Sequence, residues 1–87
     1  MSPTNKKKLN LIRVKLDKLD TELLKLIKKR SNLVNEVLKV KNHKNEIIDQ
    51  KRINFILKKI KKKSNQLKID PKITNRIWKN MIWSFID

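Results

Sequence analysis

The chain has 87 residues, and its 24 lysines and arginines against 8 acidic residues give a formal net charge of +16. A chain of this length forms one domain at most, residues 1–87, with a thin core as a monomer. It has no cysteine and one histidine, His43, which excludes a disulfide framework, a thiolate metal site and a histidine-rich site, and argues against a catalytic triad. No apolar run could span a membrane and no secretory signal is visible, so we expect a cytoplasmic protein without a membrane partner.

The longest predicted element is a helix over residues 9–41, after a polar, basic lead-in at residues 1–8 that we expect to be frayed. The helix carries an unbroken heptad pattern, and only Arg30 interrupts its apolar seam. The two seam positions are occupied by Leu9, Leu16, Leu23, Arg30 and Val37, and by Ile12, Leu19, Leu26, Leu33 and Val40. At about 1.5 Å per residue the helix is roughly 50 Å long, so it must bury this stripe against something other than its own short chain.

A shorter helix is predicted after a polar, turn-favouring segment at residues 42–45, in which we interpret His43 as solvated. Asp49 is a good N-cap for this helix. The apolar face of the helix comprises Ile53, Ile56, Leu57 and Ile60. The lysine-rich run at residues 58–63 falls largely on the opposite face, which we expect to be solvated.

A second loop is predicted at residues 64–69, and Asp70 followed by Pro71 marks the start of a last helix. We expect that helix to bury an apolar stripe made of Ile73, Ile77, Trp78, Met81, Ile82, Phe85 and Ile86. The chain is therefore predicted to be all-α, with three helices of which the first is very long.

The positive charge would ordinarily favour nucleic acid or another anionic partner. However, the chain is rich in lysine, asparagine and isoleucine and lacks alanine and glycine, which is typical of a codon bias toward A and T. Under such a bias lysine serves wherever a generic positive charge is sufficient, so we expect no specific nucleic-acid partner. Four arginines remain, Arg13, Arg30, Arg52 and Arg76, and an arginine offers a planar fork that matches a carboxylate, as lysine does not.

The spacing of cations on the long helix suggests a site for a small anion. Arg30 and Lys41 are eleven residues apart, which leaves them about 20° apart on one face and about 16 Å apart along the axis. Side chains that reach ~6 Å each leave a gap in which an anion with two acceptors fits. Arg13 lies seventeen residues before Arg30, about 25 Å away, so only a second, antiparallel copy could bring an Arg13 to this gap.

With these residues placed, the chain resembles the all-helical chorismate mutase family over nearly its whole length. The segment LNLIRVKLDKLDTELLKLIKKR is similar to the family's first helix, with Arg13 and Arg30 in register. Lys41 then falls at the family's catalytic lysine. After the loop, IIDQKR resembles the family's motif of Asp, two residues and Arg, which gives Asp49 and Arg52, and IWKNMIWSFI resembles the closing helix.

The resemblance implies an intertwined antiparallel homodimer with two sites, each built from Arg30, Lys41, Asp49 and Arg52 of one chain and Arg13 of the other. The family reaction is the pericyclic rearrangement of chorismate to prephenate, an isomerase step of phenylalanine and tyrosine biosynthesis that uses no cofactor and no metal. Arg13 and Arg30 would clamp this dicarboxylate, and Lys41 would stabilise charge on the breaking ether oxygen. Asp49 and Arg52 would cap the second helix and orient the ring end of the substrate.

Two departures from the family pattern leave alternatives open. Many members carry Glu after the motif arginine, where this chain has Ile53, and an aliphatic residue there also resembles the related isochorismate pyruvate-lyase branch. The late polar residues are missing as well, because Phe85 occupies the family's serine position unless a one-residue slip puts Ser84 there. The chain stops at Asp87, just before an expected Gln or Glu, so either it is truncated or the site manages with fewer donors.

A basic helical protein that binds nucleic acid or another partner is an alternative of a different class, and it explains the charge directly. A structural coiled coil without a ligand is the remaining alternative. Neither explains Arg30 in the seam, so we interpret the chain as a chorismate mutase, with the pyruvate lyase as its nearest rival.

Overall fold

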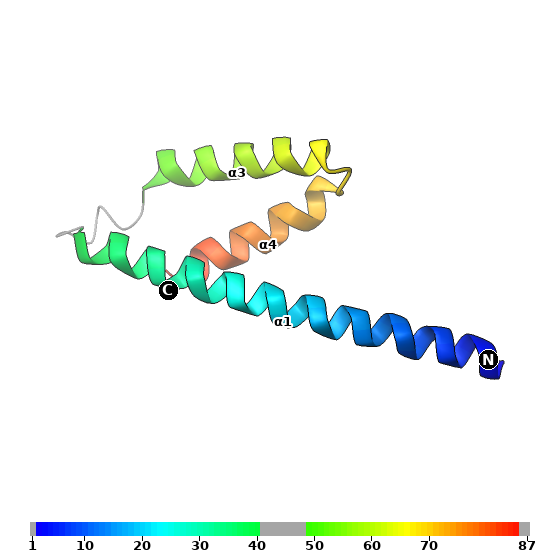
Figure 1. Ribbon diagram of the computed structural model, residues 1–87. Coiled ribbons are helices and arrows are strands. Elements are labelled where there is room, and N and C mark those ends of the chain that lie inside the picture. The colour runs from blue at the N-terminus through cyan, green and yellow to red at the C-terminus, as the bar shows by residue number, and fades with distance from the viewer. Residues whose placement is uncertain (1, 41–48, 86–87) are drawn as a thin grey trace. The chain divides into compact units, whose positions relative to one another are not determined.

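The computed structural model describes residues 2–40 and 49–85, so expectations that concern Lys41, His43 and Ile86 lie outside the described residues. Three α-helices and no strand make up the described part of the chain, and Figure 1 labels them α1, α3 and α4. The all-α prediction with three helices is therefore confirmed. The chain separates into two compact units, Met1–Val37 and Leu38–Asp87.

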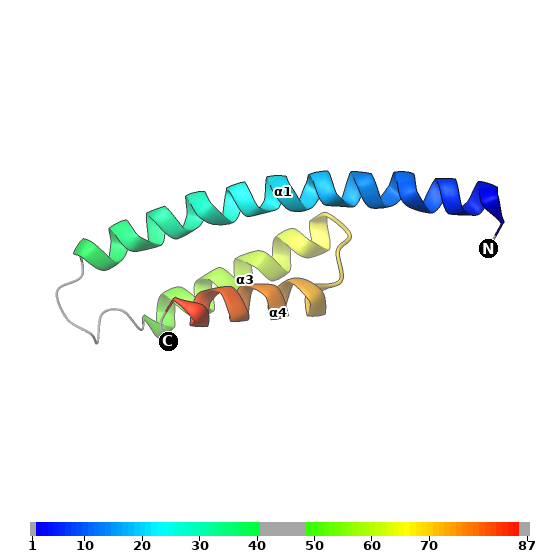
Figure 2. The same cartoon turned by 90° about the horizontal axis from the view of Figure 1, so that it is seen from below.

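Helix α1 (Pro3–Val40) has 38 residues, so it is about 57 Å long and runs without a break, as Figure 2 shows. It begins earlier than predicted, and the expectation of a frayed lead-in is wrong from Pro3 onward. Ser2 caps the helix, because its hydroxyl oxygen accepts from the Asn5 N–H at 3.2 Å and its carbonyl accepts from the Lys6 N–H at 2.9 Å. Proline at the first helical position needs no N–H partner there, which completes a favourable start.

The apolar seam of α1 is confirmed as a stripe on a helix, but a single chain does not bury it. No residue of α1 is buried, and Leu19, in the middle of the seam, is 59% exposed. Leucines on both sides of it, such as Leu16, Leu23 and Leu26, are similarly exposed. A helix of this length gains most of its stability from tertiary packing, and an exposed apolar stripe of this extent marks an interaction surface.

Helices α3 (Gln50–Gln66) and α4 (Pro71–Ser84) pack against each other as a hairpin. Both predicted N-caps are confirmed. The carboxylate of Asp49 accepts from the Arg52 N–H at 3.0 Å, and that of Asp70 accepts from the Lys72 N–H at 3.0 Å. These bonds satisfy N–H groups that the first turn of a helix leaves without an intrahelical acceptor.

The predicted apolar face of α3 is confirmed, since Ile53 is 5% exposed and Ile56, Leu57 and Ile60 are half-buried. The lysines of residues 58–63 are all exposed, as expected for the solvated face. On α4 the prediction is only partly right. Ile82 is buried and Trp78, Met81 and Phe85 are half-buried, whereas Ile73 and Ile77 are 55% and 51% exposed. These two isoleucines fall one turn apart on a second face of α4, which the hairpin leaves uncovered.

The predicted loop at residues 64–69 begins too early, because Ser64 is helical and only 3% exposed. Its hydroxyl lies 2.7 Å from the hydroxyl of Thr74 on α4, which is also buried. Ser64 donates to the Ile60 carbonyl at 2.6 Å, while Thr74 is 3.3 Å from the Pro71 carbonyl. Since each hydroxyl has one hydrogen, the shorter bond assigns the Ser64 proton to Ile60 and leaves Thr74 to donate to Ser64. The pair joins the two helices through their only buried polar side chains among the described residues.

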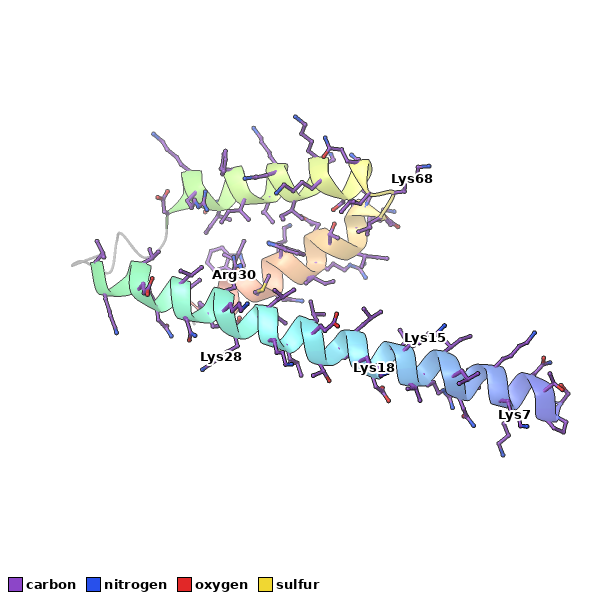
Figure 3. All side chains as sticks on the ribbon, viewed as in Figure 1. Lys7, Lys15, Lys18, Lys28, Arg30 and Lys68 are labelled. Carbon is purple, nitrogen blue, oxygen red and sulfur yellow. The ribbon has the colours of Figure 1, made fainter. Side chains whose placement is uncertain are left out.

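The turn between the helices closes without glycine. The Ile69 N–H donates to the Ser64 carbonyl at 2.8 Å and the Lys68 N–H donates to the Asn65 carbonyl at 3.2 Å. This double pattern is a Schellman motif, in which the residue after the C-cap Leu67 adopts a left-handed conformation. That residue is Lys68, with φ of 58°, and Figure 3 shows it at the tip of the hairpin.

Replacing Lys68 with glycine should stabilise the protein by about 0.5–1 kcal/mol, because glycine has no Cβ to strain the left-handed backbone. The measurement is the urea midpoint at a fixed protein concentration. Lys61→Gly is the matched control, since the same change in the exposed interior of α3 should destabilise by about 1 kcal/mol. A lower midpoint for Lys68→Gly than for the parent would contradict the turn geometry.

Candidate functional site

The two candidate arginines of α1 lie on one continuous helix. Arg13 is exposed and Arg30 is half-buried. Figure 3 shows Arg30 leaving α1 on the side away from Lys28, as two residues of helical rotation require. Since every residue between Arg13 and Arg30 is helical, their separation of about 25 Å along the axis is retained, and one small ligand cannot contact both from the same helix.

Lys41 lies outside the described residues, because the description of α1 ends at Val40. The expected gap between Arg30 and Lys41 therefore remains a prediction. The helix that carries Arg30 continues for ten residues past it without a break, which is the local condition that the prediction needs.

Asp49 and Arg52 are brought together at the start of α3, as the Asp–x–x–Arg spacing indicates. The Asp49 carboxylate accepts from the backbone N–H of Arg52, and the Asp49 carbonyl accepts from the Ile53 N–H at 2.9 Å. A negative charge at this position also complements the positive end of the helix dipole. The carboxylate is thus engaged in holding the first turn of α3, and its direct effect is to fix the backbone from which the Arg52 side chain leaves.

The side chain of Arg52 lies over an aromatic ring that sequence analysis did not single out. Its guanidinium carbon is 5.3 Å from the centroid of the Phe55 ring, and the Lys59 Nζ is 5.9 Å from the same centroid. Both distances are in the range of cation–π contacts. The sequence did contain a signal for this contact, namely the spacing of the two cations from Phe55, since residues three and four apart on a helix are neighbours. An arginine three residues before an exposed phenylalanine is such a pair.

The residue after the motif arginine contributes no polar atom. Ile53 is buried in the α3–α4 hairpin, so an acceptor for a substrate hydroxyl is missing at that position. At the end of α4, the exposed Ser84 donates its hydroxyl to the Met81 carbonyl at 2.9 Å, and Phe85 is half-buried. Ile53 and Phe85 therefore present apolar side chains, and the one polar side chain of the three, Ser84, has its proton engaged by the Met81 carbonyl.

The described residues offer cations but no cluster of metal ligands. Within residues 2–40 and 49–85, no group of three or more His, Cys, Asp or Glu side chains could hold a metal ion. Helix α3 contains no acidic residue, and four basic residues surround Phe55 within one or two turns: Lys51, Arg52, Lys58 and Lys59. Such a surface attracts anions. None of the described helices combines the length and the hydropathy that crossing a membrane requires.

The chain matches a family of known proteins. The model of the family described as chorismate mutase type II matches residues 12–87, which include most of α1 and all of α3 and α4. No curated protein and no solved structure matches the chain. The match includes residues of both units of the chain.

The capping role of Asp49 predicts which substitutions at this position destabilise the protein. Asp49→Ala should destabilise the protein by about 1 kcal/mol, since the Arg52 N–H loses its acceptor. Asp49→Asn keeps an acceptor oxygen and should stay within a few tenths of a kcal/mol of the parent. Urea unfolding of both variants, with Asp70→Ala as the matched cap on α4, measures this. Equal destabilisation by Asn and Ala would show that the charge, not the cap, is what Asp49 supplies.

Proposed function

The chain belongs to the chorismate mutase type II family, and from this we propose that it is an isomerase that rearranges chorismate to prephenate. The observation that carries the proposal is the extent of the match, which runs from Ile12 to Asp87. The reaction is intramolecular and needs no nucleophile, so the shortage of histidine and the absence of cysteine are compatible with it.

The proposed site acts in two ways: it holds the substrate in a folded conformation, and it stabilises the charge that develops in the transition state. A dicarboxylate must be folded so that its bond-forming carbons meet, and two arginine forks, Arg30 and the partner chain's Arg13, can clamp its carboxylates. As the ether bond breaks, its oxygen gains negative charge, and Lys41 is the donor that stabilises it. Asp49 and Arg52 complete the site at the start of α3, where the cap fixes their relative position.

Exposed apolar surface supports the proposal that the protein works as an antiparallel homodimer. The α1 seam is open along its length, and Ile73 and Ile77 form an uncovered face on α4. A second copy of α1 in antiparallel register, with the two-fold axis near residues 22–24, would cover the seam. The same register sets Arg13 of one chain opposite the span between Arg30 and Lys41 of the other.

One observation favours a second candidate function, isochorismate pyruvate lyase. The buried Ile53 leaves the Asp–x–x–Arg motif without the acceptor that would recognise a substrate hydroxyl. Both reactions break the same kind of ether bond, so the cations serve either. Incubation with chorismate and with isochorismate, followed by product identification, distinguishes them. Prephenate from chorismate is the expected main product, and faster release of pyruvate from isochorismate would replace our proposal with the lyase.

Replacing Lys41 with alanine should lower kcat about a hundredfold or more, with a smaller effect on KM, because its partner charge develops only in the transition state. Arg30→Lys keeps the charge but loses the fork, so it should also lower kcat/KM. Steady-state kinetics on chorismate measure both, and Lys39→Ala, on the same helix, serves as the control. A Lys41→Ala enzyme with unchanged activity would refute the site assignment.

A charge placed in the α1 seam should dissociate the dimer. Leu23→Asp puts a carboxylate at the proposed two-fold axis. The variant should be a monomer in sedimentation equilibrium at micromolar concentration, or should lose more stability than the Thr21→Asp control. Thr21→Asp introduces the same charge on the opposite face of α1 and should remain dimeric.

The orientation of the two chains is tested separately. A Lys6→Cys variant contains a single cysteine. Antiparallel pairing holds the two cysteines at opposite ends of the helix pair, so the variant should resist disulfide cross-linking. Efficient cross-linking would indicate parallel pairing, and a monomeric parent would refute the assembly.

A further inference from the structure

Phe55 is the one aromatic residue of α3, and it does not serve the hairpin core. Its side chain is 54% exposed, whereas the core side of the helix is occupied by Ile53, Ile56, Leu57 and Ile60. A single exposed phenylalanine is unremarkable in itself. What distinguishes Phe55 is that two cations of its own helix, Arg52 at i−3 and Lys59 at i+4, lie over its ring.

Arg52 has another possible partner close by, the carboxylate of Asp49 three residues earlier. That carboxylate is occupied by the Arg52 backbone N–H, and within residues 2–40 and 49–85 no carboxylate lies at ion-pairing distance from the Arg52 guanidinium. Helix α3 itself carries no acidic residue that could compete. The ring of Phe55 is therefore the group that orients Arg52 in the described structure.

Resting on the proposed function, we propose that Phe55 is a positioning residue that holds Arg52 ready for a substrate carboxylate. A ring beneath a guanidinium contacts its face and leaves the N–H donors at its edge free, and those donors are what a carboxylate binds in the plane. Stacking therefore limits the rotamers of a long side chain without neutralising its charge, as an ion pair with Asp49 would. Pre-ordering of this kind improves binding by reducing the entropy lost when the ligand arrives.

The experiment compares Phe55→Leu with the parent in steady-state kinetics on chorismate. An exposed cation–π contact is weak, so KM should rise by about two- to fivefold, with kcat nearly unchanged because the contact is the same in ground and transition states. Phe55→Tyr keeps a ring and should restore the parent KM. In an Arg52→Gln background, Phe55→Leu should have no further effect on KM, since the ring acts through Arg52. Lys61→Gln, which removes another exposed lysine of α3 and keeps the ring, Arg52 and Lys59, is the matched control and should leave KM unchanged.

A second measurement does not depend on activity. The side-chain protons of Arg52 should show ring-current shifts in the NMR spectrum of the parent and of Phe55→Tyr, and these shifts should disappear in Phe55→Leu. An unchanged KM for Phe55→Leu, a further KM rise in the Arg52→Gln background, or absent ring-current shifts would each overturn the positioning role. A parent that does not rearrange chorismate would instead refute the proposed function, and the substrate role of Phe55 with it, while the shifts would still decide the contact.

Discussion

Helix α1 is the constraint on which the rest of the molecule depends, because it has 38 residues and buries none of them. An isolated helix gains little from propensity alone, and this one has no alanine. Its leucine seam is an exposed apolar stripe, the kind of surface that packs against another element in a stable protein. A guanidinium in that seam, at Arg30, weakens a purely structural coiled coil. The same helix thus links assembly to ligand binding, since the proposed second copy both covers the seam and supplies an arginine.

A few polar residues determine where the helices begin. The chain has no glycine to end them. Ser2, Asp49 and Asp70 each accept from a backbone N–H in the first turn of the helix that follows. Two of the three starts also use proline at the first helical position. At the one described C-terminus that requires a left-handed residue, Lys68 adopts it at an energetic cost that glycine would avoid. These contacts fix the hairpin that carries Asp49 and Arg52.

The helices and the two aspartate caps were predictable because they follow from periodicity and from local hydrogen bonding. Ser64 was misassigned to a loop because serine and asparagine favour loops locally, whereas its burial depends on Thr74, ten residues away. The exposure of Ile73 and Ile77 was likewise out of reach, since a 3.6-residue period shows that a stripe is apolar but not which surface covers it. For the candidate site, residue types and spacing predicted which cations belong to it. The Asp49–Arg52 pair was confirmed as the start of a helix. The contact between Arg52 and Phe55 was not predicted, because sequence analysis did not single out Phe55.

Arginine's scarcity and its geometry point to the same residues. In a chain where lysine makes up most of the positive charge, an arginine is a candidate for a position at which a point charge is insufficient. At Arg52 the guanidinium carbon lies 5.3 Å from the centroid of the Phe55 ring, and a guanidinium that stacks on a ring by its flat face keeps its N–H edge available. The ammonium of Lys59 lies over the same ring but has no such edge, so it can be attracted to the ring without being aimed. Binding a substrate with two carboxylates depends more on hydrogen-bond donors with a fixed direction than on the net charge of the protein. Arg13, Arg30 and Arg52 are therefore better indicators of the proposed chemistry than the +16 charge of the whole chain.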